Sequence, residues 1–248
     1  MKKIIALTLT LMLMVCCLAG CGEKKDENVL TMATNAEFPP FEYLEGETIV
    51  GADVDIANAI AEKLGKTLEI TNIDFDAALT GAATGKYDVA IAGVTATDDR
   101  RQNMGFTDDY YTASQAIIVT AESDIKAAAD LEGKTISCQE GTTGEQYLLD
   151  NNYTVQSFKT GAEAITALVS GKVDAVVIDN AVAKALSAKQ DGKTVVLDEA
   201  LTEEAYAIVT KLGNDALISE INTALAELKA EGKLAEIFEK YELPYDAE

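Results

Sequence analysis

Short apolar runs alternate with amphipathic stretches through most of the chain after residue 29. Residues 30–34 and 66–73 have the composition of strands, whereas residues 53–64 carry isoleucines four positions apart, the spacing of one helical face. A short helix is expected over residues 75–84 and a buried strand over residues 87–94. Strands and helices that alternate in this way are typical of βαβ units, so the pattern predicts an α/β protein with largely parallel sheets.

One helix–turn–strand unit occurs twice along the chain. Residues 79–94 and 167–180 each lead from a helix, through Gly-Lys-X-Asp starting at Gly85 and at Gly171, into an apolar strand. Both strands end in polar or glycine residues, at the position where a parallel sheet opens a crevice for a ligand. Any α/β protein can reuse such a unit, but two similar lobes facing each other across a cleft explain both features.

The start of the chain has the pattern of an export signal. Two lysines precede an almost wholly apolar stretch that ends in Leu-Ala-Gly-Cys at residues 18–21. This order predicts a secretory signal peptide over residues 1–20. Its end also resembles a bacterial lipobox, in which the thiol of Cys21 is acylated; the alternative is an ordinary cleaved signal with a chance cysteine. Residues 21–28 are polar, and we expect a flexible tether that leaves the protein outside the cytoplasm, anchored to the cell membrane by lipid alone.

Composition excludes several classes of function. The formal net charge is −22, and it becomes −24 when the two leader lysines are removed. No basic cluster is available to neutralise phosphates, so we expect no nucleic-acid partner. The chain has no histidine, which excludes Ser-His-Asp and Cys-His catalysis and histidine-containing metal sites. We expect no metal and no cofactor, and we interpret Cys138 as a small buried residue of a strand rather than a reactive thiol.

The scarcity of arginine draws attention to one position. The chain contains only Arg100 and Arg101, which follow the predicted buried strand. Arginine is the side chain that best binds a carboxylate through two parallel hydrogen bonds, so this pair is a candidate for binding the carboxylate of a small ligand. Surface salt bridging is the alternative interpretation.

Several stretches together carry a family resemblance. In chain order they are ATNAEFPPFEY (33–43), GADVDI (51–56), GVTATDDR (93–100), FTDDYY (106–111), LEGK (131–134), QEGTTGE (139–145) and VDAVVID (173–179). Each is weak alone, but their order and spacing resemble the polar amino acid group of periplasmic-type solute-binding proteins, which feed ABC transporters. The resemblance extends over about residues 30–241.

The resemblance implies a two-lobed periplasmic-binding-protein fold of type II, in which each lobe is a mostly parallel sheet flanked by helices. Residues 29–114 with 203–248 would form lobe 1 and residues 115–202 lobe 2, joined by a two-strand hinge near residues 111–116 and 203–206. The implied partners are a free L-amino acid and the permease subunits of an ABC transporter, with the binding protein itself a monomer. Ligand would bridge the lobes and favour their closure.

The resemblance also implies which residues would bind the two charged groups of the amino acid. Arg100 would bind the α-carboxylate, together with the backbone N–H and hydroxyl of Thr95 and the N–H of Thr143. Asp179 would pair with the α-ammonium group, and the Gly93 carbonyl would accept a second hydrogen bond from it. From the sequence alone, Asp179 and Thr143 could instead serve only to cap helices.

The resemblance likewise implies which residues would contact the side chain of the ligand. Phe38 and Phe75 would wall its pocket, and Asn35 and Gln139 would contact its end; the two phenylalanines could also be ordinary core residues. Many similar proteins have Asp at the position of Asn35. Because an amide is neutral and both donates and accepts, we expect a neutral polar ligand rather than a cationic one.

Three questions remain open in the sequence. Glu37 or Glu140 would favour a basic ligand if either side chain faced the cleft. Glu37 is also the candidate acid for a second hypothesis, a dehydratase-like enzyme in the same cleft. A third hypothesis is a sensor or channel module that acts through a separate partner. Arg101 is interpreted as a surface residue.

Overall fold

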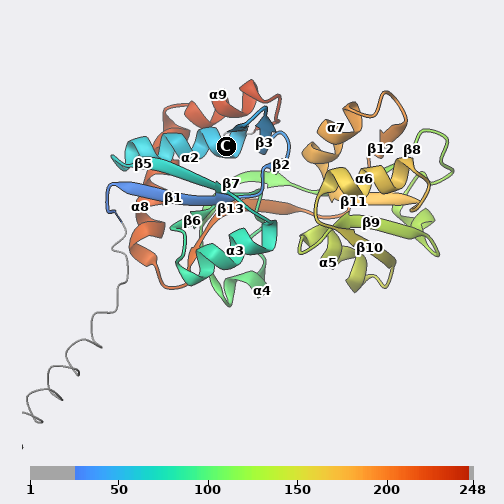
Figure 1. The fold of residues 1–248 in the computed structure, drawn as a ribbon, viewed down its shortest axis with the longest axis horizontal. Helices are drawn as coiled ribbons and strands as arrows, with labels where there is room; N and C mark the ends of the chain where they lie inside the picture. The colour runs from blue at the N-terminus through green and yellow to red at the C-terminus, as the bar shows by residue number, and fades with distance from the viewer. Residues whose placement is uncertain (1–25, 246–248) are drawn as a thin grey trace, which may run out of the picture.

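The computed structural model describes residues 26–245, which form two lobes side by side (Figure 1). The predicted signal peptide, the predicted acylation site Cys21 and most of the predicted tether lie outside these residues. No helix in the described part of the chain is both long and apolar enough to span a bilayer.

Lobe 1 is built on a five-stranded sheet with the order β5-β1-β6-β13-β7. Its strands are β1 (Val29–Thr34), β5 (Thr67–Asn72), β6 (Val89–Ala90), β7 (Met104–Ala113) and β13 (Glu204–Lys211). A small second sheet contains β2 (Glu37–Phe38), β3 (Glu42–Glu45) and β4 (Thr48–Val50). The helices are α2 (Ala52–Lys63), α3 (Phe75–Thr84), α4 (Asp98–Arg101), α8 (Asp215–Ala230) and α9 (Lys233–Lys240).

Lobe 2 has a similar five-stranded sheet with the order β10-β9-β11-β8-β12. Its strands are β8 (Gln115–Thr120), β9 (Thr135–Gln139), β10 (Thr154–Phe158), β11 (Ala175–Asp179) and β12 (Thr194–Val196). The helical elements are η1 (Ala128–Leu131), α5 (Thr143–Asp150), α6 (Gly161–Val169) and α7 (Asn180–Ala188). Cys138 is fully buried in β9, and burial raises the pKa of its thiol to about 11, so the thiol is held in its unreactive form.

Alternating side chains explain why helices cover both faces of the sheet in lobe 1. Leu30 and Met32 of β1 pack in the same cluster as α2, whereas Ala33 packs in the cluster that contains α3. Successive residues of a strand point to opposite faces, and both faces here are apolar. This arrangement leaves the ends of the strands free to carry polar groups toward the other lobe.

The expectation of mostly parallel sheets needs correction. In lobe 1, β1 pairs in parallel with β5 and β6, but β13 pairs antiparallel with β6 and β7. Lobe 2 has the same balance of two parallel and two antiparallel pairings. The sheets are mixed because the chain passes directly between the lobes. The strands in which it enters each lobe from the other, β8 in lobe 2 and β13 in lobe 1, run against the βαβ strands.

A second correction concerns the strand predicted over residues 87–94. Only Val89–Ala90 pairs as β6. The apolar run continues, but Gly93 adopts a positive φ of 55° and turns the chain toward the cleft. Its N–H donates to the buried Asp53 at 2.9 Å instead of to a neighbouring strand. An apolar run shows burial, but it does not show where strand pairing ends.

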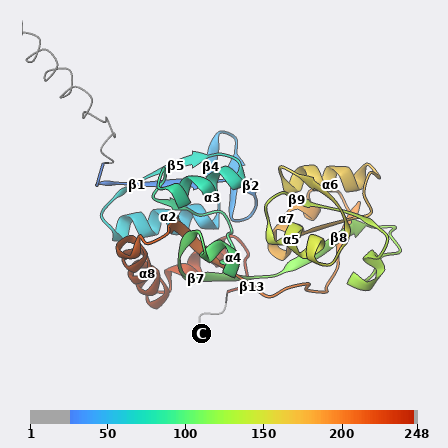
Figure 2. The ribbon, with the colours of Figure 1, turned by 90° about the horizontal axis from the view of Figure 1, so that it is seen from below.

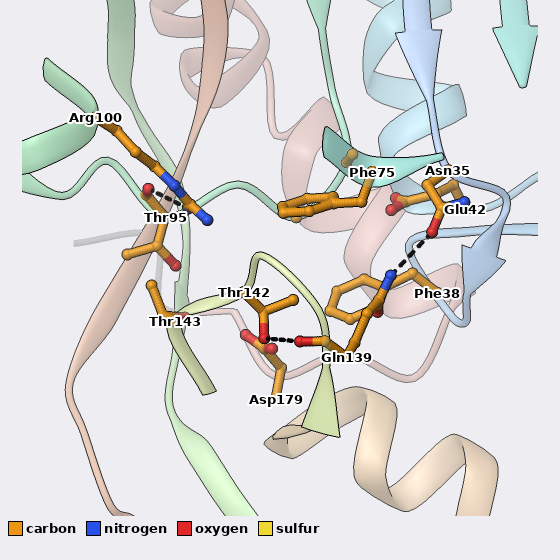
Figure 3. Close-up of a pocket in the computed structure, with 12 residues that line it drawn as sticks. Asn35, Phe38, Glu42, Phe75, Thr95, Arg100, Gln139, Thr142, Thr143 and Asp179 are labelled. Atoms are coloured by element: carbon orange, nitrogen blue, oxygen red, sulfur yellow. Dashed lines mark hydrogen bonds between the residues drawn. The ribbon is translucent and has the colours of Figure 1, made fainter. Parts of the chain in front are cut away.

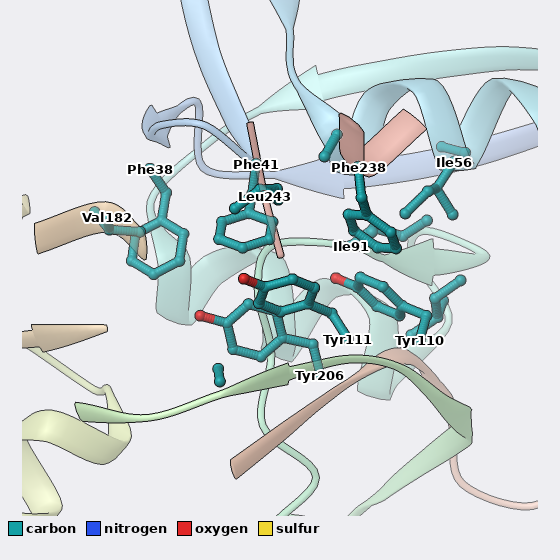
Figure 4. Packing of buried hydrophobic residues seen from close by; sticks show 14 of the residues in the cluster. Phe38, Phe41, Ile56, Ile91, Tyr110, Tyr111, Val182, Tyr206, Phe238 and Leu243 are labelled. Carbon is teal, nitrogen blue, oxygen red and sulfur yellow. The ribbon is translucent and has the colours of Figure 1, made fainter. Parts of the chain in front are cut away.

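An aromatic cluster fills lobe 1 beside the connecting strands (Figure 4). The Phe41 ring meets those of Tyr111 and Tyr206 edge-on, with centroids 5.0 and 5.1 Å apart, and Tyr111 packs against Phe238 at 5.2 Å. These contacts fix Tyr206, whose hydroxyl emerges from the cluster and donates to Asp179 of lobe 2 at 2.6 Å.

Two extended segments join the lobes, as Figures 1 and 2 show. The first is the passage from β7, which ends at Ala113, to β8, which begins at Gln115. The second leads from Thr202 of lobe 2 into β13, which begins at Glu204. Gln115 of the first segment and Glu204 of the second both hydrogen-bond to Thr143, which lines the cavity described below.

Candidate functional site

A cavity lies between the two lobes (Figure 3). It is lined by Asn35, Phe38, Glu42, Phe75, Ala92, Gly93, Thr95, Arg100, Gln139, Thr142, Thr143 and Asp179. The structure therefore brings together all nine residues that the sequence predicted to contact a ligand, and it adds Glu42, Ala92 and Thr142.

Arg100 lies at one end of the cavity, on the short helix α4. Its Nη1 donates to the Thr95 carbonyl at 2.8 Å, and its Nη2 crosses the cleft to the Gly141 carbonyl at 3.0 Å. The guanidinium group lies over the Phe75 ring, 5.7 Å from the centroid. Burial lowers the pKa of Arg100, but guanidinium groups remain protonated in proteins, so this end of the cavity is cationic.

Two backbone donors accompany Arg100. Val94 and Ala96 make the hydrogen bonds to β13, so Thr95, which forms the isolated bridge with Tyr206, has its N–H directed away from that strand. Thr143 is the first residue of α5, where an N–H has no acceptor within the helix. An N–H from each lobe is thus available beside the guanidinium group, which is the donor set that a carboxylate requires.

The threonine hydroxyls have other partners. The Thr95 and Thr143 hydroxyls both donate to Glu204, at 2.6 and 2.7 Å. Helix α5 is capped by Thr142, whose hydroxyl oxygen accepts from the Glu145 N–H at 3.3 Å. The capping interpretation therefore applies to Thr142, whereas the Thr143 side chain takes part in a contact between the lobes.

Asp179 is the last residue of β11 and precedes α7, but its side chain makes no capping hydrogen bond. Its Oδ1 accepts from the Tyr206 hydroxyl at 2.6 Å. Burial, with a further contribution from the Glu204 charge, raises the pKa of Asp179 to about 6. The carboxyl group of Asp179 is therefore buried beside the cavity and is not used to cap α7. It is suited to pair with an ammonium group, which would replace the water that burial removes.

Gly93 shapes the middle of the cavity wall. Its φ of 55° is a conformation that favours glycine, and an added Cβ would lie 2.6 Å from Cε1 of Phe38. The turn directs the Gly93 N–H to Asp53 and places Gly93 in the cavity wall. Phe38 can approach the backbone this closely because no side chain intervenes.

Amides occupy the end of the cavity away from Arg100 (Figure 3). Gln139 Nε2 donates across the cleft to Asn35 Oδ1 at 3.1 Å, and Asn35 Nδ2 donates to the Ile73 carbonyl at 3.1 Å. Gln139 Oε1 is buried and has no hydrogen-bond partner among residues 26–245. A ligand that donates a hydrogen bond here would satisfy this oxygen.

Glu42 is the functional candidate that sequence reasoning missed. It is fully buried on β3 and lines the same end of the cavity, and no donor in the described chain reaches either carboxylate oxygen. Burial first, and then the neighbouring Asp53, raise the pKa of Glu42 well above its ordinary range. Asp53 already accepts from Gly93 and from the Tyr110 hydroxyl, so a proton shared between the two carboxyl groups belongs on Glu42.

The two acidic residues considered from the sequence lie elsewhere. The Glu37 side chain is exposed and does not line the cavity. Glu140 is also exposed and pairs with Lys159 at 2.6 Å. Neither supplies the acid that an enzyme in this cleft would need. Across residues 26–245, no group of three or more acidic, cysteine or histidine side chains is arranged to hold a metal ion.

Comparison with known proteins gives consistent results. The profile of the bacterial extracellular solute-binding proteins, family 3, matches residues 30–244. The arginine-binding extracellular protein ArtP of Bacillus subtilis is 30% identical over 250 residues, which cover 97% of this chain and 98% of ArtP. A solved structure described as an ancestral arginine-binding protein bound to glutamine superposes with a TM-score of 0.83 at 39% identity, covering 87% of this chain and 98% of that one. Another, bound to arginine, gives 0.82 at 40% identity, with coverage of 86% and 98%.

Proposed function

Because the chain belongs to the bacterial extracellular solute-binding proteins of family 3, we propose that it captures a free L-amino acid outside the cytoplasm and delivers it to an ABC transporter permease. One observation carries the proposal. Arg100 of lobe 1 and Asp179 of lobe 2 line a single enclosed cavity, with phenylalanine rings on its walls. An α-carboxylate at Arg100 and an α-ammonium group at Asp179 would join the lobes through one ligand and favour their closure.

A neutral polar side chain, such as that of glutamine, is the first candidate for the far end of the cavity. The Asn35 and Gln139 amides lie there, and the unpartnered Gln139 oxygen can accept a hydrogen bond from a ligand amide. A protonated Glu42 can donate to the oxygen of the same ligand amide. This set of donors and acceptors matches a primary amide.

A guanidinium side chain is the second candidate, and Glu42 is the observation that favours it. Its buried carboxyl group has no donor within the described residues, so a cationic ligand could take the place of the proton that neutralises it. The comparison structures named for glutamine and for arginine share one fold with this chain, which makes both ligands reasonable first choices.

Isothermal titration calorimetry tests the proposal. The protein is unfolded and refolded to remove bound ligand and is then titrated with glutamine, asparagine, serine, cysteine, cystine, arginine, lysine and histidine. We expect glutamine or arginine to give the tightest binding. The absence of heat with every amino acid would contradict the proposed function.

We also propose that the protein acts as a monomer held to the membrane by lipid on Cys21, as the leader pattern suggests. Incorporation of labelled palmitate in cells tests the anchor. Label in the native chain that is absent from Cys21→Ser would support it, whereas an unlabelled native chain would contradict it.

A further inference from the structure

Glu204 occupies the start of β13, where the chain returns from lobe 2 to lobe 1. Three threonine hydroxyls meet its carboxylate. Those of Thr95 and Thr143 donate to Oε2 at 2.6 and 2.7 Å, and that of Thr202 donates to Oε1 at 2.7 Å. Thr95 belongs to lobe 1 and Thr143 to lobe 2, so a single carboxylate oxygen holds hydroxyls from both lobes.

The direction of these hydrogen bonds follows from Gln115, a fully buried residue at the start of β8. Its Nε2 donates to the Thr143 hydroxyl oxygen at 3.2 Å, and its backbone N–H donates to that of Thr202 at 2.9 Å. A hydroxyl group has one proton, and in each case the acceptor within reach of that proton is Glu204. The carboxylate therefore receives hydrogen bonds relayed from the other connecting strand.

This network does not use the backbone N–H groups that are expected to bind the ligand. The hydroxyl protons of Thr95 and Thr143 are committed to Glu204, whereas the backbone N–H groups of the same residues remain available for a ligand carboxylate. The network can therefore exist both with and without ligand. Because Glu204 begins a strand of lobe 1 and Thr143 begins a helix of lobe 2, we expect their hydrogen bond to break when the lobes move apart.

We infer that Glu204 is a latch between the lobes, a positioning residue that stabilises the closed arrangement independently of the ligand. Hydrogen bonds made only in one conformation raise the population of that conformation. If the closed form is the one that holds ligand tightly, the latch raises the affinity for every ligand by the same factor, while Glu42 and the amides decide between ligands. Only the affinity arm of the test below rests on the proposed function.

The experiment compares Glu204→Ala and Glu204→Gln with the native chain. Both variants remove the charge near Arg100, so the difference between them reports hydrogen bonding; glutamine keeps one oxygen that accepts from the threonines. Glu203→Ala is the matched control, because this exposed neighbour loses the same charge on the same segment. The radius of gyration of each ligand-free chain is measured by small-angle X-ray scattering, and amino acid affinities by calorimetry.

We expect the ligand-free radius of gyration to increase in Glu204→Ala, to increase less in Glu204→Gln and to stay unchanged in the control. Each amino acid that binds should bind roughly tenfold more weakly to Glu204→Ala than to Glu204→Gln, with the order of ligands preserved. An unchanged radius of gyration in Glu204→Ala would overturn the latch, as would an affinity loss confined to one ligand, which indicates direct ligand contact. If the native chain binds no amino acid, the proposed function fails, and scattering still decides whether the latch exists.

Discussion

The charged side chains of the cavity lie at different places along it, and their separation orients the ligand. Arg100 is at one end, Glu42 is at the other, and Asp179 comes from the opposite lobe (Figure 3). A ligand with a carboxylate, an ammonium group and a polar side chain can satisfy all three only in one orientation.

Arg100→Ala should weaken binding of the preferred amino acid by about 2–5 kcal/mol, because it leaves a buried carboxylate without its cationic partner. Calorimetry measures the loss. Arg101→Ala is the matched control, since Arg101 is exposed and stacks on Phe106 outside the cavity. Equal affinities in the two variants would show that the carboxylate binds elsewhere.

The affinity should depend on the protonation of Asp179. Burial raises its pKa to about 6 in the empty site, so the group is ionised above pH 6 and protonated below it. The ligand ammonium group pairs with the ionised form, so affinity should be flat above pH 6 and fall by up to about tenfold per unit below it. Calorimetry between about pH 4.5 and about pH 8, a range that brackets this pKa, records the profile. Asp179→Asn should bind weakly without that decline, and a native profile that is flat throughout would contradict the assignment.

Glu42 should decide between a cationic and a neutral ligand side chain. Among the described residues that line the cavity, Glu42 supplies the carboxyl group at the far end, and Glu42→Gln removes it. We expect it to weaken arginine binding by about tenfold or more relative to glutamine binding. Glu37→Gln, at an exposed position outside the cavity, should leave the ratio unchanged. A constant arginine-to-glutamine ratio in both variants would exclude Glu42 from specificity.

Single residues differ in how far the sequence reveals them. Arg100 could be selected because arginine is rare in this chain, and Asp179 because it ends an apolar strand. Glu42 could not, because an acidic residue on a short strand usually faces solvent, and only the small sheet of lobe 1 turns it inward. The link from Glu204 to the two threonines depends on tertiary packing and has no local pattern.

At the scale of elements, periodicity located helices well and strand ends poorly. Residues 75–84 were predicted as a helix and form α3 with the same bounds. The strand predicted over residues 87–94 was wrong beyond Ala90, because Gly93 turns the backbone. The parallel direction of the sheets was predicted from βαβ alternation, which gives no information on the strands that cross between the lobes.

The turn at Gly93 provides a test of element geometry. Gly93→Ala forces a side chain into a left-handed conformation, at a cost of about 1–2 kcal/mol, and pushes the Phe38 ring out of place. Gly65→Ala imposes a similar φ of 66° with no atom near the added Cβ. Both variants should lower the midpoint of thermal unfolding, but only Gly93→Ala should lose amino acid affinity, by at least about tenfold. Full affinity in Gly93→Ala would mean that the turn does not shape the site.

At the scale of the whole molecule, the apolar packing is continuous across the boundary between the lobes. One continuous cluster includes Leu30 and Tyr206 of lobe 1 together with Ile178 and Val182 of lobe 2. The Gln139–Asn35 and Tyr206–Asp179 hydrogen bonds cross the same boundary. Two lobes could be anticipated from the repeated helix–turn–strand unit, but this shared packing could not, because it joins residues far apart in the sequence.

Ligand binding should therefore stabilise both lobes together. An amino acid held by Arg100 and Asp179 binds only the folded, closed protein, so at 100 times the dissociation constant it should add about 2.7 kcal/mol to the free energy of unfolding. Differential scanning calorimetry should show one transition that moves to higher temperature as ligand is added. Arg100→Ala should show a much smaller shift at the same ligand concentration, because its affinity is weaker. Two transitions of which only one moves would mean that the ligand binds a single lobe, and closure of the cleft would then need a different cause.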